Sequence, residues 1–370
     1  MTAKESVFSG SNKPIIILIG LIALTAVLYI AQGIIVPLVF AVVIAILLNP
    51  VVKFFVRKRI NHIFAISITL FLSFLIIASF GMLIFSQVTR FNDSWPILVD
   101  RSTELLNQSI NSASNYFDID KQLILEWIAK TKSELINTGS SALGQTLLAL
   151  GNEVANLLLI PFYVFVILYY KPLLLYFTYQ TFASYNQSKV TEIITQTRTV
   201  IQQYLIGLVI EFVMVSTLNS IALLALGIEY AILLGIIGGL LNLIPYIGGL
   251  VAVALPMMVA IATKTSGWYA IYVLILYYAI QLFDNNYIVP KIVASKVKIN
   301  ALFSVIVVLA GYQLWGISGM FLSIPLLAIV KVFFDHIDSL QHWGVLLGET
   351  MPIPIRLKKL TRKIKSIHHD

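Results

Sequence analysis

Long apolar stretches separated by short polar connections dominate the chain. Stretches of about twenty residues that hold at most one charged residue lie near 14–33, 34–52, 63–89, 154–170, 204–226 and 268–290. A helix needs about 20 apolar residues to cross the hydrocarbon core of a bilayer. The pattern therefore predicts an all-α polytopic membrane protein, and two longer apolar stretches bring the expected total to about eight membrane segments.

The two longer stretches, Ala231–Ala262 and Ala301–Val330, carry helix-breaking and amide residues near their middles. A continuous helix of about 30 residues would rise roughly 45 Å, well beyond the roughly 30 Å hydrocarbon core. Lipid cannot satisfy the backbone groups freed at a break, so each break should be buried in protein or line a wet cavity. The residues expected to form or flank breaks are Asn242, Pro245, Gly248, Gly249, Pro290, Gly311, Gln313, Gly316, Ser318, Gly319 and Pro325.

Each long stretch has two possible topologies, a single kinked span or a re-entrant hairpin that leaves the membrane where it entered. If both span, Lys291, Lys296 and Lys298 fall outside the cell and Lys264 inside; if both re-enter, these sides are exchanged. Short cytoplasmic loops carry an excess of Lys and Arg. The charge pattern therefore favours two hairpins, while the spanning alternative stays open.

The hairpin interpretation gives the second half of the chain an internal symmetry. A span near 204–226 with the hairpin 231–262 is followed, in opposite orientation, by a span near 268–290 with the hairpin 301–330. Inverted repeats with broken helices place substrate sites near the membrane midplane and support alternating access. Transport is therefore the leading function on physical grounds.

Charge outside the apolar stretches predicts the remaining organisation. Lys and Arg cluster in short connections and near the carboxyl end, which predicts that both termini are cytoplasmic. The region 90–150 is polar and acidic-leaning and is expected to be external, with short amphipathic helices around Leu123–Ile128. The expected divisions are three spans in 1–89, the external region 90–150, a span and connector in 151–203, a transport core in 204–333 and a basic tail in 334–370.

Composition supports the bilayer as solvent and narrows the chemistry. Hydrophobic residues make up 59% of the 370 residues and charged residues 11%, whereas soluble domains are roughly one quarter charged. The net charge of +8 is explained by membrane orientation, so no nucleic-acid partner is expected. The chain has no cysteine, HExxH motif, Walker A loop or GxGxxG motif. No cofactor is expected, and an ion gradient of Na⁺ or H⁺ is the expected energy source.

One short motif points to a different class, that of intramembrane serine proteases. Gly316-Ile-Ser318-Gly319 matches their GxSG motif, and such a serine needs a histidine as its base. None of the five histidines lies inside an apolar stretch. The sequence therefore predicts that the protein is not an enzyme.

Two acids inside predicted spans are the strongest candidates for function. An ionisable residue at the centre of a membrane helix costs about 2.5 to 3.5 kcal/mol on insertion scales, so Glu211 and Asp284 each require a reason. Both could couple transport to protons or sodium, or could instead be hydrogen-bonded packing contacts. The expected substrate- or ion-binding residues are Glu211, Asn242, Pro245, Tyr246, Gly248, Gln281, Asp284, Asn285, Asn286 and Gln313. Room for several waters at Asn242 and Gln313 would favour a solute, whereas a tight cluster of oxygens around Asp284 would favour an ion.

The second half of the chain carries a series of short motifs. They are Gln203-Tyr204-Leu-Ile-Gly207, Leu226-Gly227, Leu234-Gly235-Ile-Ile-Gly238-Gly239, Asn242-Leu-Ile-Pro245-Tyr246-Ile-Gly248, Gln281 with Asp284-Asn285-Asn286, Pro290, Gly311, Trp315-Gly316, Gly319 and Ile324-Pro325. In these residues the chain resembles the autoinducer-2 exporter-like (AI-2E) family of bacterial membrane proteins. The chain departs from the pattern in three places: Gly249 stands where the family often has proline, Asp284 stands where it often has glutamate, and Ala294 and Ser295 occupy a loop where it often has glycine.

The resemblance implies a multi-pass transporter of the bacterial cytoplasmic membrane that assembles as a homo-oligomer, with a pentamer as the expected assembly. Family members are associated with efflux of the signalling molecule autoinducer-2 and with sodium/proton antiport. The leading expectation is an ion-coupled exporter of a small polar solute. The alternatives are a sodium or lithium/proton antiporter and a non-transporting membrane scaffold or sensor.

Overall fold

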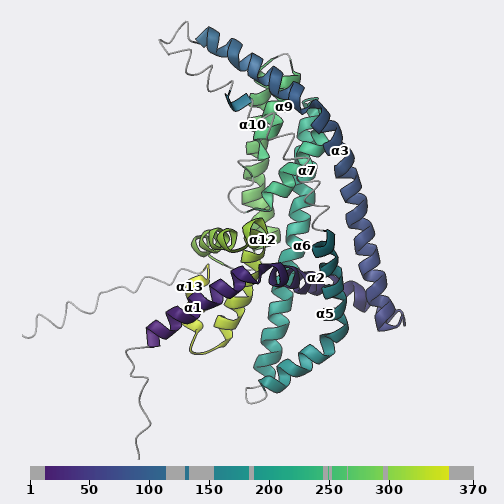
Figure 1. The fold of residues 1–370 in the computed structure, drawn as a ribbon, viewed down its shortest axis with the longest axis vertical. Helices are drawn as coiled ribbons and strands as arrows, with labels where there is room; N and C mark the ends of the chain where they lie inside the picture. The colour runs from purple at the N-terminus through teal and green to yellow at the C-terminus, as the bar shows by residue number, and fades with distance from the viewer. Residues whose placement is uncertain are drawn as a thin grey trace, which may run out of the picture.

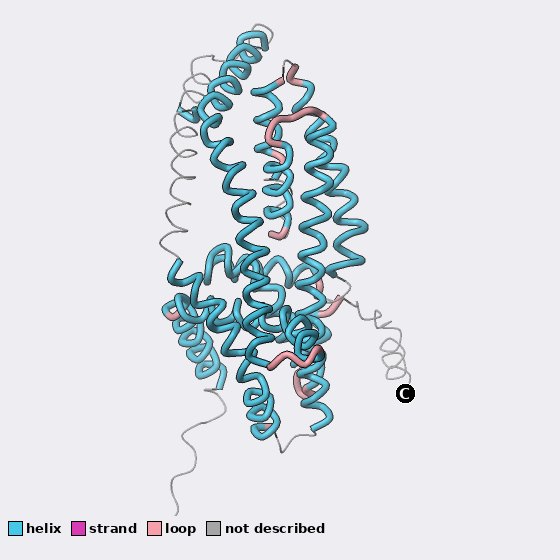
Figure 2. Tube along the Cα trace, turned by 90° about the vertical axis from the view of Figure 1, so that its right-hand side faces the viewer, coloured by secondary structure: helices cyan, strands magenta, loops and turns pink. Residues whose placement is uncertain are grey.

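The computed structural model describes residues 13–113, 130–132, 154–182, 187–244, 249, 252–264, 266–294 and 299–349. The amphipathic helices expected around Leu123–Ile128 and most of the basic tail lie outside these residues. Within the described residues the chain is helical except for short turns and one isolated antiparallel bridge between Ile299 and Gly348. Figure 2 shows this helical course with its short loops.

The helices in chain order are α1 (Lys13–Ile30), α2 (Gln32–Arg57), α3 (His62–Ala113), α5 (Val154–Thr181), α6 (Gln187–Ala225), α7 (Ala231–Asn242), α9 (Ala254–Thr263), α10 (Trp268–Phe283), the π-helix η1 (Asp284–Ala294), α12 (Ala301–His336) and α13 (Gln341–Leu347) (Figure 1). Five of them, α2, α3, α5, α6 and α12, contain segments long and apolar enough to cross a membrane. Many of their large apolar side chains are exposed, as a lipid environment requires. The chain is thus a helical multi-pass membrane protein, and the total of eight segments stays a prediction.

Helix α3 extends well past the end of the predicted span. The candidate membrane span within α3 is His62–Phe91, and the helix continues without a break to Ala113, so the division expected at residue 90 falls inside a helix and the external location of 90–150 stays a prediction. Trp95 and Val99 on this continuation are buried against α7 and α9, and Ser94 Oγ lies 2.7 Å from Tyr230 Oη. The polar residues that suggested a boundary, such as Arg90 and Arg101, lie on the exposed face of the same helix.

The first long apolar stretch doubles back on itself. Helix α7 ends at Asn242, and α9 begins at Ala254 and packs in the same hydrophobic cluster as α7. A Cβ atom built on Gly227, before α7, would lie 3.0 Å from Nζ of Lys264, at the end of α9. The two ends of the stretch therefore lie at the same end of the molecule, in the upper half of Figure 1. The described residues of this stretch therefore form two helices rather than one continuous helix, and re-entry from one side of the membrane stays a prediction.

The second long stretch is sharply broken inside α12. Trp315 has φ −137° and ψ 19°, and Gly316 has φ 61° and ψ −141°, a conformation that favours glycine. A Cβ atom on either Gly311 or Gly319 would overlap the backbone of the other. In a continuous helix, residues eight positions apart are separated by about 12 Å. The two halves of α12 therefore cross immediately beside the break, in the lower half of Figure 1.

The residues expected at breaks lie in different parts of the fold. Inside α12 only Trp315 and Gly316 leave helical backbone angles, and Gly311, Gly319 and Pro325 lie in the helical parts on either side. The two glycines allow the halves of the helix to approach, and Pro325 is buried among neighbouring helices, where a membrane helix can tolerate proline. Pro290 lies within η1, and Gly249 lies between α7 and α9, at the expected first break.

Candidate functional site

Small residues bring α7 unusually close to α6. A Cβ on Gly235 would overlap Oγ of Ser220, and a Cβ on Gly239 would overlap Oγ of Ser216. Small residues four apart on each helix let the two backbones approach closely, as in other membrane helix pairs. This packing directs Asn242, the last residue of α7, towards the side of α6 that carries Glu211.

Asn242 joins the two membrane acids. Its Nδ2 donates a hydrogen bond to Glu211 Oε1 at 3.1 Å and another to Asp284 Oδ2 at 2.9 Å. Asp284 is 1% exposed and Glu211 is 5% exposed. We call Glu211, Asn242 and Asp284 the acid cluster, and it is formed by residues from α6, the end of α7 and the start of η1.

Within the part of the chain that the structure describes, the two carboxyl groups of the acid cluster have no basic partner. Among the described residues, no Lys, Arg or His forms an ion pair with either carboxylate. Asp284 Oδ1 is also buried and has no hydrogen-bond partner among those residues. Two ionised carboxylates sharing one amide in an apolar interior are unfavourable, because each is desolvated and each repels the other. A proton or a small cation bound between them would relieve both costs.

The start of η1 and the first break enclose the cluster on one side. Gln281 Nε2 donates to Asp284 Oδ2 at 3.4 Å and to Asn285 Oδ1 at 3.3 Å. A Cβ on Gly249 would overlap Oε1 of Gln281, so the backbone of Gly249 lies directly against this amide. The α-helical pattern of α10 ends at Phe283 and changes to the wider π-helix at Asp284. π-helical segments are rare and often occur at functional sites.

The structure gathers only some of the residues expected to bind substrate or ion. Asn286 is exposed and donates to the carbonyl oxygen of Leu282 on its own helix at 2.7 Å. Gln313 is exposed, and no hydrogen bond among the described residues joins it to the acid cluster. Pro245, Tyr246 and Gly248 lie outside the described residues. The first break and the two acids therefore meet, whereas the second break contributes no described side chain to the cluster.

A second pair of buried polar side chains, which the sequence did not single out as a site, lies about two helical turns from the cluster. Asn219 Oδ1 and Tyr277 Oη are buried without hydrogen-bond partners among the described residues. A Cβ on Gly238 would lie 2.9 Å from Asn219 Nδ2 and 3.4 Å from Tyr277 Oη, so this glycine separates the two side chains. Tyr277 precedes Asp284 by seven residues, about two helical turns, and that spacing is the signal that could have identified it.

These contacts also fix the relative direction of α6 and α10. Glu211 is joined to Asp284 through Asn242, and Asn219, eight residues further along α6, neighbours Tyr277, seven residues before Asp284, across Gly238. Residue numbers therefore rise along α6 as they fall along α10. The two helices are antiparallel, as the predicted inverted repeat requires of its two full spans.

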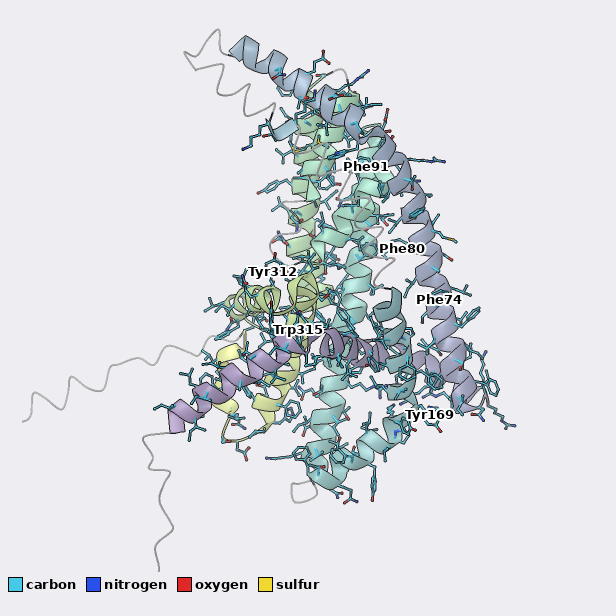
Figure 3. All side chains as sticks on the ribbon, in the orientation of Figure 1. Phe74, Phe80, Phe91, Tyr169, Tyr312 and Trp315 are labelled. Carbon is cyan, nitrogen blue, oxygen red and sulfur yellow. The ribbon has the colours of Figure 1, made fainter. Side chains whose placement is uncertain are left out.

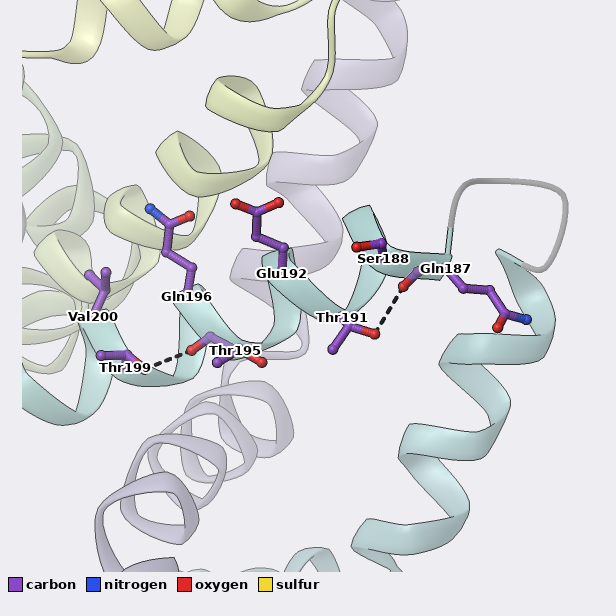
Figure 4. Close-up of a pocket in the computed structure, with 8 residues that line it drawn as sticks. All are labelled: Gln187, Ser188, Thr191, Glu192, Thr195, Gln196, Thr199 and Val200. Atoms are coloured by element: carbon purple, nitrogen blue, oxygen red, sulfur yellow. Dashed lines mark hydrogen bonds between the residues drawn. The ribbon is translucent and has the colours of Figure 1, made fainter.

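A polar groove lies at the other end of α6, away from the acid cluster. It has a volume of about 730 Å³ and is lined by Gln187, Ser188, Thr191, Glu192, Thr195, Gln196, Thr199 and Val200 (Figure 4). Thr191 and Thr199 donate their hydroxyl protons to carbonyl oxygens one turn earlier in α6. The groove shares no residue with the acid cluster, and two of its hydroxyl donors are already used, so we do not place the transport chemistry there.

The shared amide of the cluster gives a testable effect on stability. In an Asn242→Leu variant the two carboxylates lose their common donor, and a buried acceptor left unsatisfied costs about 1 to 3 kcal/mol. The cost is larger for ionised than for protonated carboxyls. The melting temperature of Asn242→Leu relative to the wild type should therefore fall more at pH 8.5 than at pH 5.5. A Gln313→Leu variant, at the exposed residue near the second break, should show no such pH dependence; a pH-independent loss in Asn242→Leu would contradict this view of the cluster.

Buried acids without a basic partner, beside a broken apolar segment in a helical multi-pass protein, are features typical of membrane transporters. The comparison with known sequences agrees with that class. A model described as AI-2E family transporter matches residues 18–339. The chain therefore belongs to the AI-2E family of transporters, and the resemblance inferred from the motif around Asn242 is confirmed.

Three relatives show how far the similarity extends. The AI-2 transport protein TqsA of Escherichia coli (strain K12) is 25% identical over 351 residues, covering 94% of this chain and 98% of that protein. A sodium-lithium/proton antiporter of Halobacillus andaensis is 27% identical over 343 residues, covering 87% and 94%. YueF of Bacillus subtilis (strain 168), which is named for transport without a substrate, is 24% identical over 317 residues, covering 82% and 84%.

Proposed function

We propose that the protein is a secondary transporter in which the acid cluster binds the coupling cation, H⁺ or Na⁺. The observation that carries the proposal is that Glu211 and Asp284 share one amide donor, are nearly completely buried, and have no basic partner among the described residues. Such a site is most stable with one positive charge bound, and can exchange one cation for another.

The depth of the cluster supports a transport role. Helix α7 has 12 residues and rises about 18 Å from Ala231 to Asn242, a little over half of a hydrocarbon core of roughly 30 Å. If 231–262 and 301–330 are re-entrant hairpins that enter from opposite sides, the cluster lies near the midplane. Alternating access then proceeds by movement of the hairpins around a fixed cation site.

The tight geometry favours cation/proton exchange as the activity. The amide of Asn242 donates to Glu211 and Asp284, and the amide of Gln281 donates to Asp284 and Asn285, so these side-chain oxygens are held close together. The polar groove lies elsewhere on α6. A cluster of this kind suits a cation better than an organic solute. The similarity to a protein named sodium-lithium/proton antiporter supports the same activity.

Export of a small polar solute, such as autoinducer-2, is the second candidate. It is supported by similarity along nearly the whole chain to a protein named AI-2 transport protein. The amides of Gln281 and Asn285 extend from the buried acids towards the exposed side of η1 and offer both donors and acceptors. In this case the acid cluster supplies the ion coupling and the amides contact the solute.

The proposal also covers the location, the orientation and the assembly of the protein. The cytoplasmic membrane of a bacterium is the expected location, with both termini on the cytoplasmic side, as the positions of Lys and Arg predict. A homo-oligomer is proposed as the assembly. The wide exposed apolar surfaces of α1, α3 and α5 leave room for lipid and for neighbouring copies.

Proton flux in proteoliposomes tests the proposed function. The purified protein is reconstituted in liposomes that contain a pH-sensitive dye, and sodium, lithium or potassium is added outside. Cation/proton exchange predicts a change of internal pH with sodium or lithium and none in protein-free liposomes. An absence of flux with every cation from folded protein would overturn the exchange activity, and autoinducer-2 export would then be tested first.

A further inference from the structure

Lys171 lies in an apolar helix far from the acid cluster in sequence. It follows Tyr170 and precedes Pro172 within the candidate span Leu159–Thr181 of α5. It is half-buried, and its Nζ donates to Oδ1 of Asn49, on α2, at 2.7 Å. An ionisable residue at such a position is costly and usually has a partner of opposite charge.

The charged neighbours of Lys171 are positive. Lys53 lies one helical turn after Asn49 on α2, and Arg198 lies about one turn before Ile201 of α6, which packs in one hydrophobic cluster with Val43 and Ile46 of α2. Both cations lie near enough to Lys171 to repel its charge. Among the described residues, no carboxylate forms an ion pair with Lys171, Lys53 or Arg198. Three cations from three different helices therefore lie together and repel one another, and nothing described compensates their charge.

Asn49 supplies an independent observation at the same place. It is 5% exposed, its carbonyl oxygen accepts from Lys171, and its amide nitrogen has no hydrogen-bond partner among the described residues. Thr197, the neighbour of Arg198, likewise has a buried hydroxyl without a partner there. Unsatisfied buried donors are uncommon in folded proteins and call for a ligand or another explanation. The group lacks acceptors and negative charge, which a bound anion provides.

We propose that Lys53, Lys171 and Arg198 form a binding site for a phosphate-bearing anion, with Asn49 holding the Lys171 ammonium in place. An anionic phospholipid headgroup is the expected source of the phosphate. The exposed tyrosines Tyr169 and Tyr170 precede Lys171 on α5, and tyrosines favour the interface between hydrocarbon and headgroups. Figure 3 shows Tyr169 on the outer side of this part of the molecule.

The site would fix the depth of the α2–α5 pair in the membrane. These helices pack through a shared apolar cluster that includes Ala45 and Val52 on α2 and Leu168 on α5. A headgroup held between α2, α5 and the first part of α6 would link the α2–α5 pair to the helix that leads into the transport core. Basic pockets between membrane helices are a known form of headgroup recognition. This inference is independent of the proposed activity of the acid cluster.

Lipid retention tests the site. The full-length protein is extracted in a neutral detergent from membranes rich in phosphatidylglycerol and cardiolipin, and the bound lipid is quantified by mass spectrometry. Lys171→Gln, which keeps a donor for Asn49 but removes the charge, should retain about fivefold less anionic lipid than the wild type. Arg198→Gln, which does not alter the Asn49 contact, should show a similar loss.

Lys58→Gln is the matched control, because Lys58 follows α2 at the same end of the helix but lies over the ring of Phe54 rather than beside Lys171. It should retain lipid like the wild type. A second arm uses the delipidated protein and inorganic phosphate: a stabilisation that disappears in Lys171→Gln and Arg198→Gln, without retained lipid, identifies a free anion as the ligand. Equal lipid retention and equal phosphate response in the wild type and both variants, with all of them folded, would overturn the site.

Discussion

Replacing Asp284 by asparagine is expected to abolish cation-driven proton flux in proteoliposomes. The side chain keeps its size and can still hydrogen-bond with Asn242, but it can no longer bind and release a proton or balance a cation. Asp284 is 1% exposed, and one of its oxygens has no hydrogen bond among the described residues. The variant therefore removes the charge of a buried group while it keeps the shape of the side chain. We expect the flux to fall by more than about tenfold, since a membrane acid in a transport path is a functional group.

The control for this variant is Asn286→Leu. Asn286 lies two residues further along η1, is exposed, and bonds only to the backbone of its own helix among the described contacts. Its replacement should leave the flux within about twofold of the wild type, as expected of a surface change. A folded Asp284→Asn protein with undiminished flux would move the coupling site away from the acid cluster.

Replacing Gly319 by alanine should cause the largest loss of stability. The new Cβ would overlap the carbonyl oxygen and carbonyl carbon of Gly311, which are backbone atoms and cannot move aside by a rotamer change. Overpacking of this kind costs about 1 to 3 kcal/mol, and we expect a value near the upper end because the crossing of the two halves of α12 must open. The melting temperature in detergent and the transport rate should fall together.

The matched control is Gly81→Ala in α3. Gly81 is also a helical glycine, but a Cβ built there meets no atom within 4 Å. Alanine has a higher helix propensity than glycine, so this variant should be neutral or slightly stabilising. If Gly319→Ala were as stable as Gly81→Ala, the close crossing of the two halves of α12 would not exist in the protein.

The sequence was most informative where a residue type conflicts with the bilayer. Glu211, Asp284 and Asn242 stood out because polar groups are costly inside apolar stretches, and the structure brings these three together. The break at Gly316 could be expected for a similar reason, since a 30-residue helix is too long for the membrane. In each case the conflict between one residue or one segment and the bilayer can be seen from the sequence alone.

The sequence was less informative where contacts over long separations decide the structure. The burial of Trp95 and Val99 against α9 extends α3 past residue 90, and no local pattern records that packing. Glycine in a helix can mark a break or allow close approach of a neighbouring segment, and only the fold shows that Gly311 and Gly319 lie directly against each other. Tyr277 was missed because a tyrosine in an apolar span is common, whereas its buried hydroxyl is visible only in three dimensions.

The central claim is that the acid cluster exchanges a proton for a cation, and proton release on cation binding tests it most directly. Sodium or lithium is added to the purified protein in weakly buffered detergent solution, and the protons released are counted with a pH indicator. The wild type should release protons in proportion to the cation bound, and a Glu211→Gln, Asp284→Asn double variant should release none. Cation binding without proton release, or equal release from the folded double variant, would contradict the account.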